Sequence, residues 1–151
     1  MIVATSHFST RLAIQRSLKA EVAGATMVML MPPYHGATLK PSEPSIRKYF
    51  EEIGKKITIP VMVQDAPMSG INMSVEFLVA LARDYPQIRY FNIETPNAAV
   101  KIDALTKVGG RAIYGPFDGE ESITLMADLD AGATGTMPSA LLPDLIKPIL
   151  E

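Results

Sequence analysis

The chain alternates short apolar runs with longer amphipathic segments. Each apolar run is nearly continuous rather than strictly alternating, and this pattern is typical of parallel strands buried on both faces. The runs predict six strands: Ile2–Ser6, Met27–Met31, Pro60–Gln64, Ile88–Ile93, Ala112–Gly115 and Ala133–Met137.

The segments between the strands carry apolar residues at helical spacing. They predict five helices: Thr10–Val22, Ser45–Lys56, Ser74–Asp84, Asn97–Val108 and Glu121–Ala131. N-cap residue types precede or begin three of them, at Ser9, Ser74 and Asn97. Glycines typical of helix ends follow at Gly24, Gly109 and Gly132. Strict alternation of strand and helix predicts a parallel α/β sheet, either a barrel or a doubly wound fold.

Composition narrows the class of protein. The 151 residues are 48% apolar and 20% charged, which suits one globular domain with a sizeable core. A net charge of −2 provides no basic face for nucleic acid, and the absence of cysteine excludes disulfides and thiolate chemistry. No apolar run approaches the roughly 18 residues of a membrane span, and residues 1–10 lack a signal-peptide pattern. We therefore expect a cytoplasmic protein that binds neither nucleic acid nor membrane.

Polar residues concentrate where the predicted strands end. Ligands of parallel α/β folds lie at the carboxyl ends of the strands, so we expect the functional site at this edge. Neither a glycine-rich phosphate loop nor a nucleophile elbow occurs there. The polar residues at these ends include Thr5, Ser6, His7, Tyr34, His35, Gln64, Asp65, Asn92, Glu94, Thr95, Asp118, Thr136 and Ser139.

Four of these strand ends resemble motifs of a known superfamily. The motifs are Met31–His35, Val63–Pro67, Tyr90–Thr95 and Gly115–Glu121. Together they are similar to the dihydrodipicolinate synthase/N-acetylneuraminate lyase superfamily, and most of all to its branch of L-2-keto-3-deoxyarabonate dehydratase and related sugar-acid dehydratases. The resemblance implies a partial (β/α)₈ TIM barrel of six βα units, strands three to eight, in one incomplete domain over residues 1–151. The first two βα units, with the usual anchor for the substrate carboxylate, are then absent.

The resemblance also implies a class I lyase reaction. Members of the superfamily form a Schiff base between a lysine of the sixth barrel strand and a 2-keto acid. Asn92 stands at that position, and because an amide cannot form a Schiff base, we expect no covalent catalysis. Tyr34 matches a proton-relay tyrosine, and Gln64 stands where many relatives carry another tyrosine. The remaining predicted substrate contacts are His7, Gln64, Asp65, Glu94, Asp118 and Met137, of which the carboxylates equally suit helix caps and Met137 equally suits the core.

The implied activity is the elimination of water from 2-keto-3-deoxy sugar acids, without a cofactor or metal and in a homo-oligomer, a tetramer in the family. One alternative is a non-catalytic fragment or pseudoenzyme that binds or assembles without turnover. Another is a metal-dependent aldolase whose ligands would come from His7, His35, Asp65, Glu94 and Asp118. A doubly wound, flavodoxin-like binding module is a further alternative.

Overall fold

A computed structural model describes residues 1–35, 40–119, 121–138 and 143–151. Its sheet has five strands, all paired in parallel and arranged in chain order. A flavodoxin-like sheet reverses its strand order at a switch point, so the sequential order contradicts that alternative and agrees with a barrel. The strands are β1 (Ile2–Ala4), β2 (Met27–Leu30), β3 (Val61–Asp65), β4 (Ile88–Ile93) and β5 (Gly115–Asp118).

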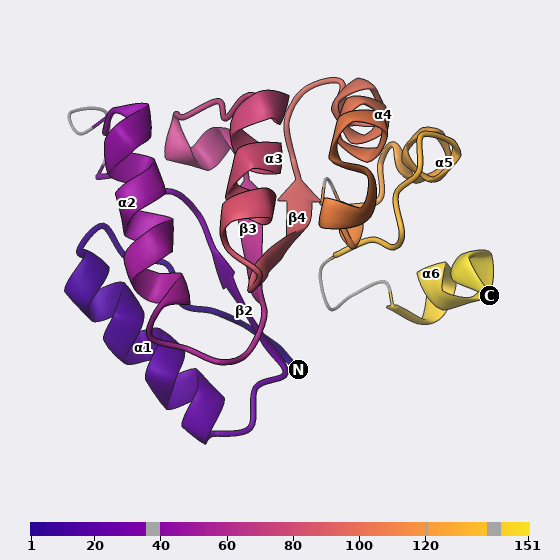
Figure 1. The fold of residues 1–151 in the computed structure, drawn as a ribbon. Helices are drawn as coiled ribbons and strands as arrows, with labels where there is room; N and C mark the ends of the chain where they lie inside the picture. Colours follow the sequence, from indigo (N-terminus) through magenta and orange to yellow (C-terminus); the bar gives the residue numbers. More distant parts are fainter. Residues whose placement is uncertain (36–39, 120, 139–142) are drawn as a thin grey trace.

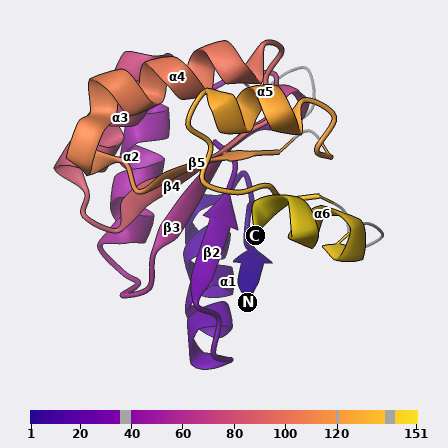
Figure 2. The ribbon, with the colours of Figure 1, turned by 90° about the vertical axis from the view of Figure 1, so that its right-hand side faces the viewer.

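Helices α1 to α5 follow one another around the outside of the sheet, and α6 lies apart from them (Figures 1 and 2). Consecutive helices contact each other from α1 to α2 and from α3 through α4 to α5. The helices are α1 (Thr10–Val22), α2 (Glu43–Gly54), α3 (Val75–Asp84), α4 (Ala98–Gly109), α5 (Leu125–Asp130) and α6 (Pro143–Leu150), with 3₁₀ helices η1 (Pro67–Ser69) and η2 (Gly110–Ala112). The layer order, strands inside and helices outside, is that of a barrel wall.

The hydrophobic core lies between the sheet and helices α1 to α4. Phe50 of α2, Leu78 of α3, Phe91 of β4 and Ile102 of α4 are among its fully buried side chains. Burying each such side chain stabilises the fold by about 1.5–3 kcal/mol. The apolar stripes predicted for α2 and α3 therefore meet the outer face of the sheet, whereas several residues of the stripes predicted for α1, α4 and α5, such as Val22, Val100 and Ile123, are exposed.

Two predicted elements begin later than the sequence pattern indicated. The strand predicted at Ala112–Gly115 lies instead at Gly115–Asp118, because the chain leaves α4 through η2, with a positive φ of 50° at Gly110. The last predicted helix, Glu121–Ala131, is regular only from Leu125 to Asp130, because residues 121 and 122 have φ angles of 53° and 64° that a right-handed helix does not allow.

The sixth predicted strand, Ala133–Met137, forms an irregular ladder with β5. Its only bridge among the described residues pairs Thr136 with Asp118 in parallel. The amide of Thr134 donates to Pro116 O, but the amide of Asp118 donates to Gly135 O, so the hydrogen bonds slip by one residue. A bulge of this kind interrupts a regular strand without removing it from the sheet edge.

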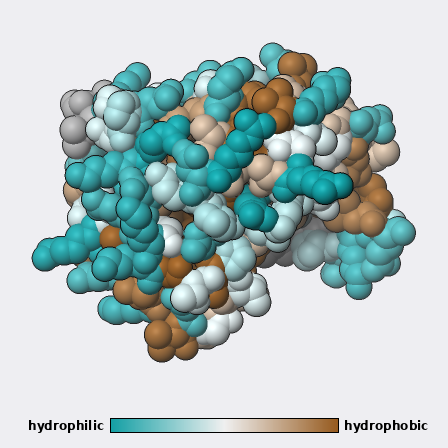
Figure 3. Space-filling view, in the orientation of Figure 1, coloured by the Kyte–Doolittle hydropathy of each residue, from teal (hydrophilic) through white to brown (hydrophobic). Residues whose placement is uncertain are grey.

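Of the three predicted N-caps, Ser74 alone caps its helix through the side chain, accepting from the amide of Phe77 at 3.1 Å. Exposed apolar side chains gather over α4 and α5 and at the end of α1 (Figure 3). They include Val22, Val100, Val108, Ile123 and Met126. Among the described residues, every helix is too short or too polar to cross a membrane.

Candidate active site

A cavity of about 740 Å³ opens on the inner face of the sheet, at the carboxyl ends of the strands. This is the edge where the sequence predicts the site. Its polar centre consists of Gln64 from β3, Asn92 from β4 and Glu94 just beyond β4. The remaining lining residues are Ile2, Met29, Phe117, Gly119, Glu121, Thr136, Met137, Pro138 and Pro143.

The pleat of the strands places the three polar residues in the cavity. Gln64 pairs with Asn92 across β3 and β4, so both side chains point to the same face. The next residue on β4, Ile93, points to the opposite face and is fully buried in the core. The strand register therefore fixes Gln64 and Asn92 side by side.

Glu94 joins these two amides into one hydrogen-bonded group. Its Oε1 accepts from Gln64 Nε2 and from Asn92 Nδ2, both at 2.7 Å. Asn92 is 2% exposed, and its Oδ1 is buried without a hydrogen-bond partner among the described residues. A buried acceptor without a partner is costly, and a ligand hydroxyl or a water that donated to it would remove this cost.

Gly119 closes the wall of the cavity beside this group. A Cβ at this position would lie 2.5 Å from Glu94 Cγ and 2.6 Å from Asn92 Oδ1, which no side chain tolerates. Glycine is thus required for the backbone after β5 to approach the polar centre.

His7 and Tyr34 lie in a separate, smaller cavity of about 310 Å³ at the ends of β1 and β2. The ring of Phe8 stacks on His7 and contacts His35, with centroid distances of 4.4 and 4.8 Å. His7 Nδ1 accepts from the amide of Ser9 at 2.9 Å, so in the neutral ring the proton is on Nε2. The Tyr34 hydroxyl donates to Met68 Sδ at 3.5 Å. The structure therefore places these two predicted site residues in a different cavity from Gln64, Asn92 and Glu94.

The dihydrodipicolinate synthetase family model matches residues 1–142 of the chain. The chain belongs to this family. L-2-keto-3-deoxyarabonate dehydratase of Azospirillum brasilense is 54% identical over all 151 residues, and 4-hydroxy-tetrahydrodipicolinate synthase of Hydrogenobaculum sp. is 28% identical over 149 residues. The dihydrodipicolinate synthase structure from Aquifex aeolicus superposes on 99% of the chain with a TM-score of 0.87 and 24% identity.

The chain spans about half the length of these relatives, 49% of each curated protein and 50% of the Aquifex chain. Its parallel sheet and outer helices form part of a (β/α)₈ barrel, as the sequence predicts. The family fold also accounts for the position of the polar centre, because the ends of parallel barrel strands converge on one site.

Two predicted substrate contacts of this family member, Asp65 and Asp118, are fully buried and line neither cavity in the described part of the chain. Asp65 Oδ2 forms an ion pair with Lys101 at 2.5 Å. Asp118 Oδ2 accepts from the Thr136 hydroxyl at 2.5 Å. The role of both carboxylates as substrate contacts stays a prediction. The structure shows instead the protein groups that each of them contacts.

Burial raises the pKa of Asp65 above its ordinary value, and the ammonium of Lys101 and the amide of Met73 act in the opposite direction. Burial also raises the pKa of Asp128 on α5. A hydrogen bond from Thr124 opposes the shift at Asp128, and the neighbouring Asp118 adds to it. On the helix side of the sheet, the buried Asp65 thus has a cationic partner, Lys101, whereas the buried Asp128 has an acidic neighbour, Asp118.

The positions of the other candidate residues complete the site. Met137 lines the 740 Å³ cavity next to Thr136, whereas Ser139 lies outside the described residues. The proposed metal ligands do not converge, since no three His, Asp or Glu side chains of the described residues form a group able to hold a metal ion.

Neither Gly119 as a site residue nor Lys101 as a partner of Asp65 was predicted from the sequence. Lys101 follows Ala98 by three positions and precedes Leu105 by four, so it lies on the buried stripe of α4. A lysine on a buried stripe is a signal for a buried anionic partner.

Proposed function

We propose that the chain derives from a Schiff-base lyase that removes water from 2-keto-3-deoxy sugar acids. We propose further that it binds such an acid without turning it over. The observation that carries the proposal is the position of Asn92, which is buried at the end of β4 and lines the cavity. The 54% identity to L-2-keto-3-deoxyarabonate dehydratase supports the choice of substrate class.

The chemistry of Asn92 accounts for the expected lack of turnover. Schiff-base catalysis needs a primary amine whose lone pair adds to the keto carbon. The lone pair of an amide nitrogen is delocalised, and Asn92 Nδ2 already donates to Glu94. The non-catalytic alternative and the lyase lineage thus describe one molecule, a lyase scaffold that lacks its nucleophile.

The same polar centre suits a polyhydroxylated acid. Asn92 Oδ1 accepts hydrogen bonds, and hydroxyl groups of a sugar acid are donors. Glu94 already accepts from two amides, which holds its carboxylate at the floor of the cavity. A ligand carrying several hydroxyl groups would therefore meet the fixed carboxylate of Glu94, whereas the buried Asn92 Oδ1 would first have to become exposed.

The test is to install the amine. In an Asn92→Lys variant, a 2-keto-3-deoxy sugar acid should condense with the new amine with loss of water, and borohydride should reduce the resulting imine to a stable secondary amine. Mass spectrometry of the peptide containing residue 92 should then show the adduct. The unaltered chain should bind the same acid in a calorimetric titration but give no adduct.

An Asn92→Gln variant is the matched control, since it lengthens the side chain without supplying an amine. A folded Asn92→Lys variant that forms no adduct would contradict the Schiff-base lineage. An adduct at another residue of the unaltered chain would contradict the loss of covalent catalysis.

Homo-oligomer formation is a separate part of the proposal. Exposed apolar side chains on α4 and α5, including Val100 at 71% and Ile123 at 79% exposure, support it. Sedimentation analysis of the 151-residue chain should show a multimer that dissociates when Val100 and Ile123 are replaced by serine. A monomer at all concentrations would refute this part.

A further inference from the structure

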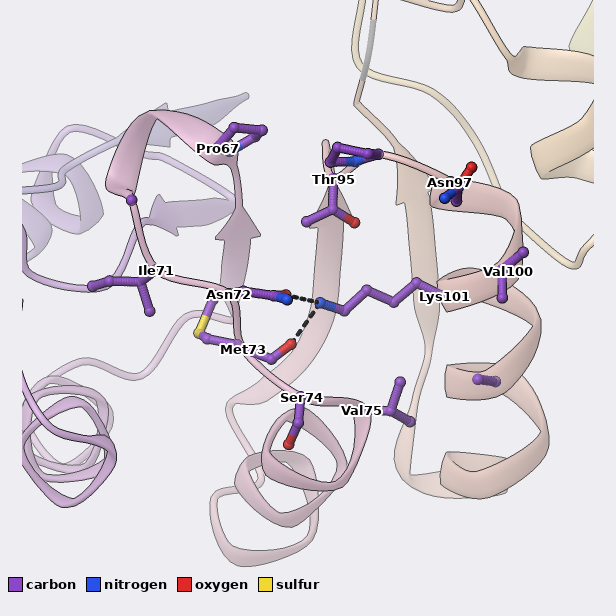
Figure 4. Close-up of a pocket in the computed structure, with 13 residues that line it drawn as sticks. Pro67, Ile71, Asn72, Met73, Ser74, Val75, Thr95, Asn97, Val100 and Lys101 are labelled. Atoms are coloured by element: carbon purple, nitrogen blue, oxygen red, sulfur yellow. Dashed lines mark hydrogen bonds between the residues drawn. The ribbon is translucent and has the colours of Figure 1, made fainter.

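Lys101 extends from α4 across an outer groove of about 620 Å³ toward the segment that precedes α3 (Figure 4). Its Nζ lies 2.5 Å from Asp65 Oδ2, 2.5 Å from the carbonyl oxygen of Met73 and 3.2 Å from Asn72 Oδ1. An ammonium group has three hydrogens, and these three acceptors match them. The Lys101 side chain is 13% exposed and that of Asp65 is 0% exposed.

These contacts join two neighbouring βα units. Asp65 ends β3 and Met73 lies between η1 and α3, whereas Lys101 belongs to the helix that follows β4. The same two units are joined on the other face of the sheet by the hydrogen bond from Gln64 to Glu94. The two links start from adjacent residues of β3, so a shift of the backbone at Asp65 also moves the point from which the Gln64 side chain starts.

The backbone between these links is also shared. The amide of Glu94 donates to Asp65 O at 3.0 Å, which places the end of β3 directly beside the polar centre. Without Lys101, the buried carboxyl of Asp65 would either take up a proton or shift toward water. Either response alters the end of β3, where the side chain of Gln64 begins.

We infer that Lys101 is a positioning residue of the candidate site, holding Gln64 against Glu94 from the opposite face of the sheet. It acts without touching a ligand, because it does not line the 740 Å³ cavity. That the site binds a ligand rests on the proposed function. That Lys101 maintains the geometry of the site does not.

NMR spectroscopy of the ¹⁵N-labelled 151-residue chain tests this inference. The side-chain NH₂ resonances of Gln64 and Asn92 report on the hydrogen bonds that these groups donate. In the unaltered chain the two protons of the Gln64 amide should be well separated and exchange slowly, because one is bound to Glu94. In Lys101→Met they should converge and exchange about tenfold faster or more. The affinity for a 2-keto-3-deoxy sugar acid should fall in parallel.

A second variant keeps the test valid if Lys101→Met fails to fold. Asp65→Asn combined with Lys101→Met removes both charges of this pair, so it should fold while still lacking the link between α4 and β3. Its Gln64 resonances should remain displaced. Unaltered Gln64 resonances in this folded double variant would overturn the inference.

Two controls separate positioning from a general loss of stability. Lys55→Met removes a lysine from an exposed ion pair with Glu51, and Leu78→Ala removes core packing on α3. Both should leave the Gln64 resonances unchanged. Failure of the unaltered chain to bind the sugar acid would refute the proposed function alone, since the amide resonances do not depend on a ligand.

Discussion

Gln64 and Asp65 are neighbours on β3, yet they lie on opposite faces of the sheet and in different surroundings. Gln64 faces the open cavity and donates to Glu94, whereas Asp65 is sealed beneath the helices with Lys101 as its ionic partner. The inner face thus holds a polar group that lines the cavity, with Gln64 and Glu94 half-buried, and the outer face holds acids that are fully buried. Changes on the outer face should therefore affect stability most, and changes on the inner face should affect binding most.

The largest effect is expected for Lys101→Met on the outer face. Removing one partner of a buried ion pair leaves the other uncompensated, and the free energy of unfolding should fall by about 3 kcal/mol. Urea unfolding monitored by circular dichroism measures this loss. Lys55→Met, which removes an exposed pair, should cost less than about 1 kcal/mol. Equal losses in the two variants would show that the outer face does not depend on this pair.

The loss in Lys101→Met should also depend on pH. Without the lysine, burial raises the pKa of Asp65 with less opposition, so the folded state favours the protonated acid. Stability is then greatest below the unfolded pKa, about 4, and decreases as the pH rises toward the folded pKa. The deficit relative to the unaltered chain should grow from pH 4 to pH 7, and adding Asp65→Asn should remove this pH dependence.

Gly119→Ala tests the inner face at its tightest point. The new Cβ would meet Glu94 Cγ at 2.5 Å and Asn92 Oδ1 at 2.6 Å, so the polar centre must shift. We expect a loss of about 1–3 kcal/mol in unfolding free energy, together with weaker binding of a 2-keto-3-deoxy sugar acid. Gly54→Ala is a suitable control, because a Cβ there has no atom within 4 Å. Unchanged binding by Gly119→Ala would argue that Asn92 and Glu94 do not contact the ligand.

Gln64→Leu should separate binding from stability most clearly. Glu94 would keep its bond from Asn92 but lose the one from Gln64, and the half-buried site should make the cost in unfolding free energy about 1 kcal/mol. Ligand affinity, measured by titration calorimetry, should fall by a larger factor than in a Gln15→Leu control on the exposed surface of α1. Equal affinities in the two variants would contradict the proposal that the ligand binds at the inner face.

The division between the faces explains which parts of the structure the sequence could predict. Continuous apolar runs identified β2, β3 and β4 closely, because burial on both faces leaves few polar residues within them. The start of α5 was misplaced, because the left-handed conformations of Glu121 and Ser122 have no strong signal in residues other than glycine.

The faces of the carboxylates were harder to predict. Asp65 is the last residue of β3 and Glu94 the first residue after β4, and this difference of one position in the pleat sends Asp65 to the helices and Glu94 to the cavity. Strand register decides this, and register depends on contacts between distant segments. Asn92 could be named as a candidate because the motif around it resembles the family. Glu94, which accepts a hydrogen bond from Asn92, belongs to the same motif.

The smallest effect concerns Asp128, a further buried acid of the outer face. Here the partner is Asp118 rather than a lysine, so burial and the neighbouring carboxyl both raise the pKa of Asp128. The contribution of Asp128 to stability is therefore lost as the pH rises from about 4 through the folded pKa of Asp128. Asparagine is neutral at every pH and can donate to Asp118, so Asp128→Asn should gain stability relative to the unaltered chain as the pH increases. Melting temperatures at pH 4 and pH 7, with the exposed Asp130→Asn as control, measure this difference. Parallel pH profiles for the unaltered chain and Asp128→Asn would mean that Asp128 has the same pKa in the folded and the unfolded chain, and the effect assigned to its burial and its acid partner would be refuted.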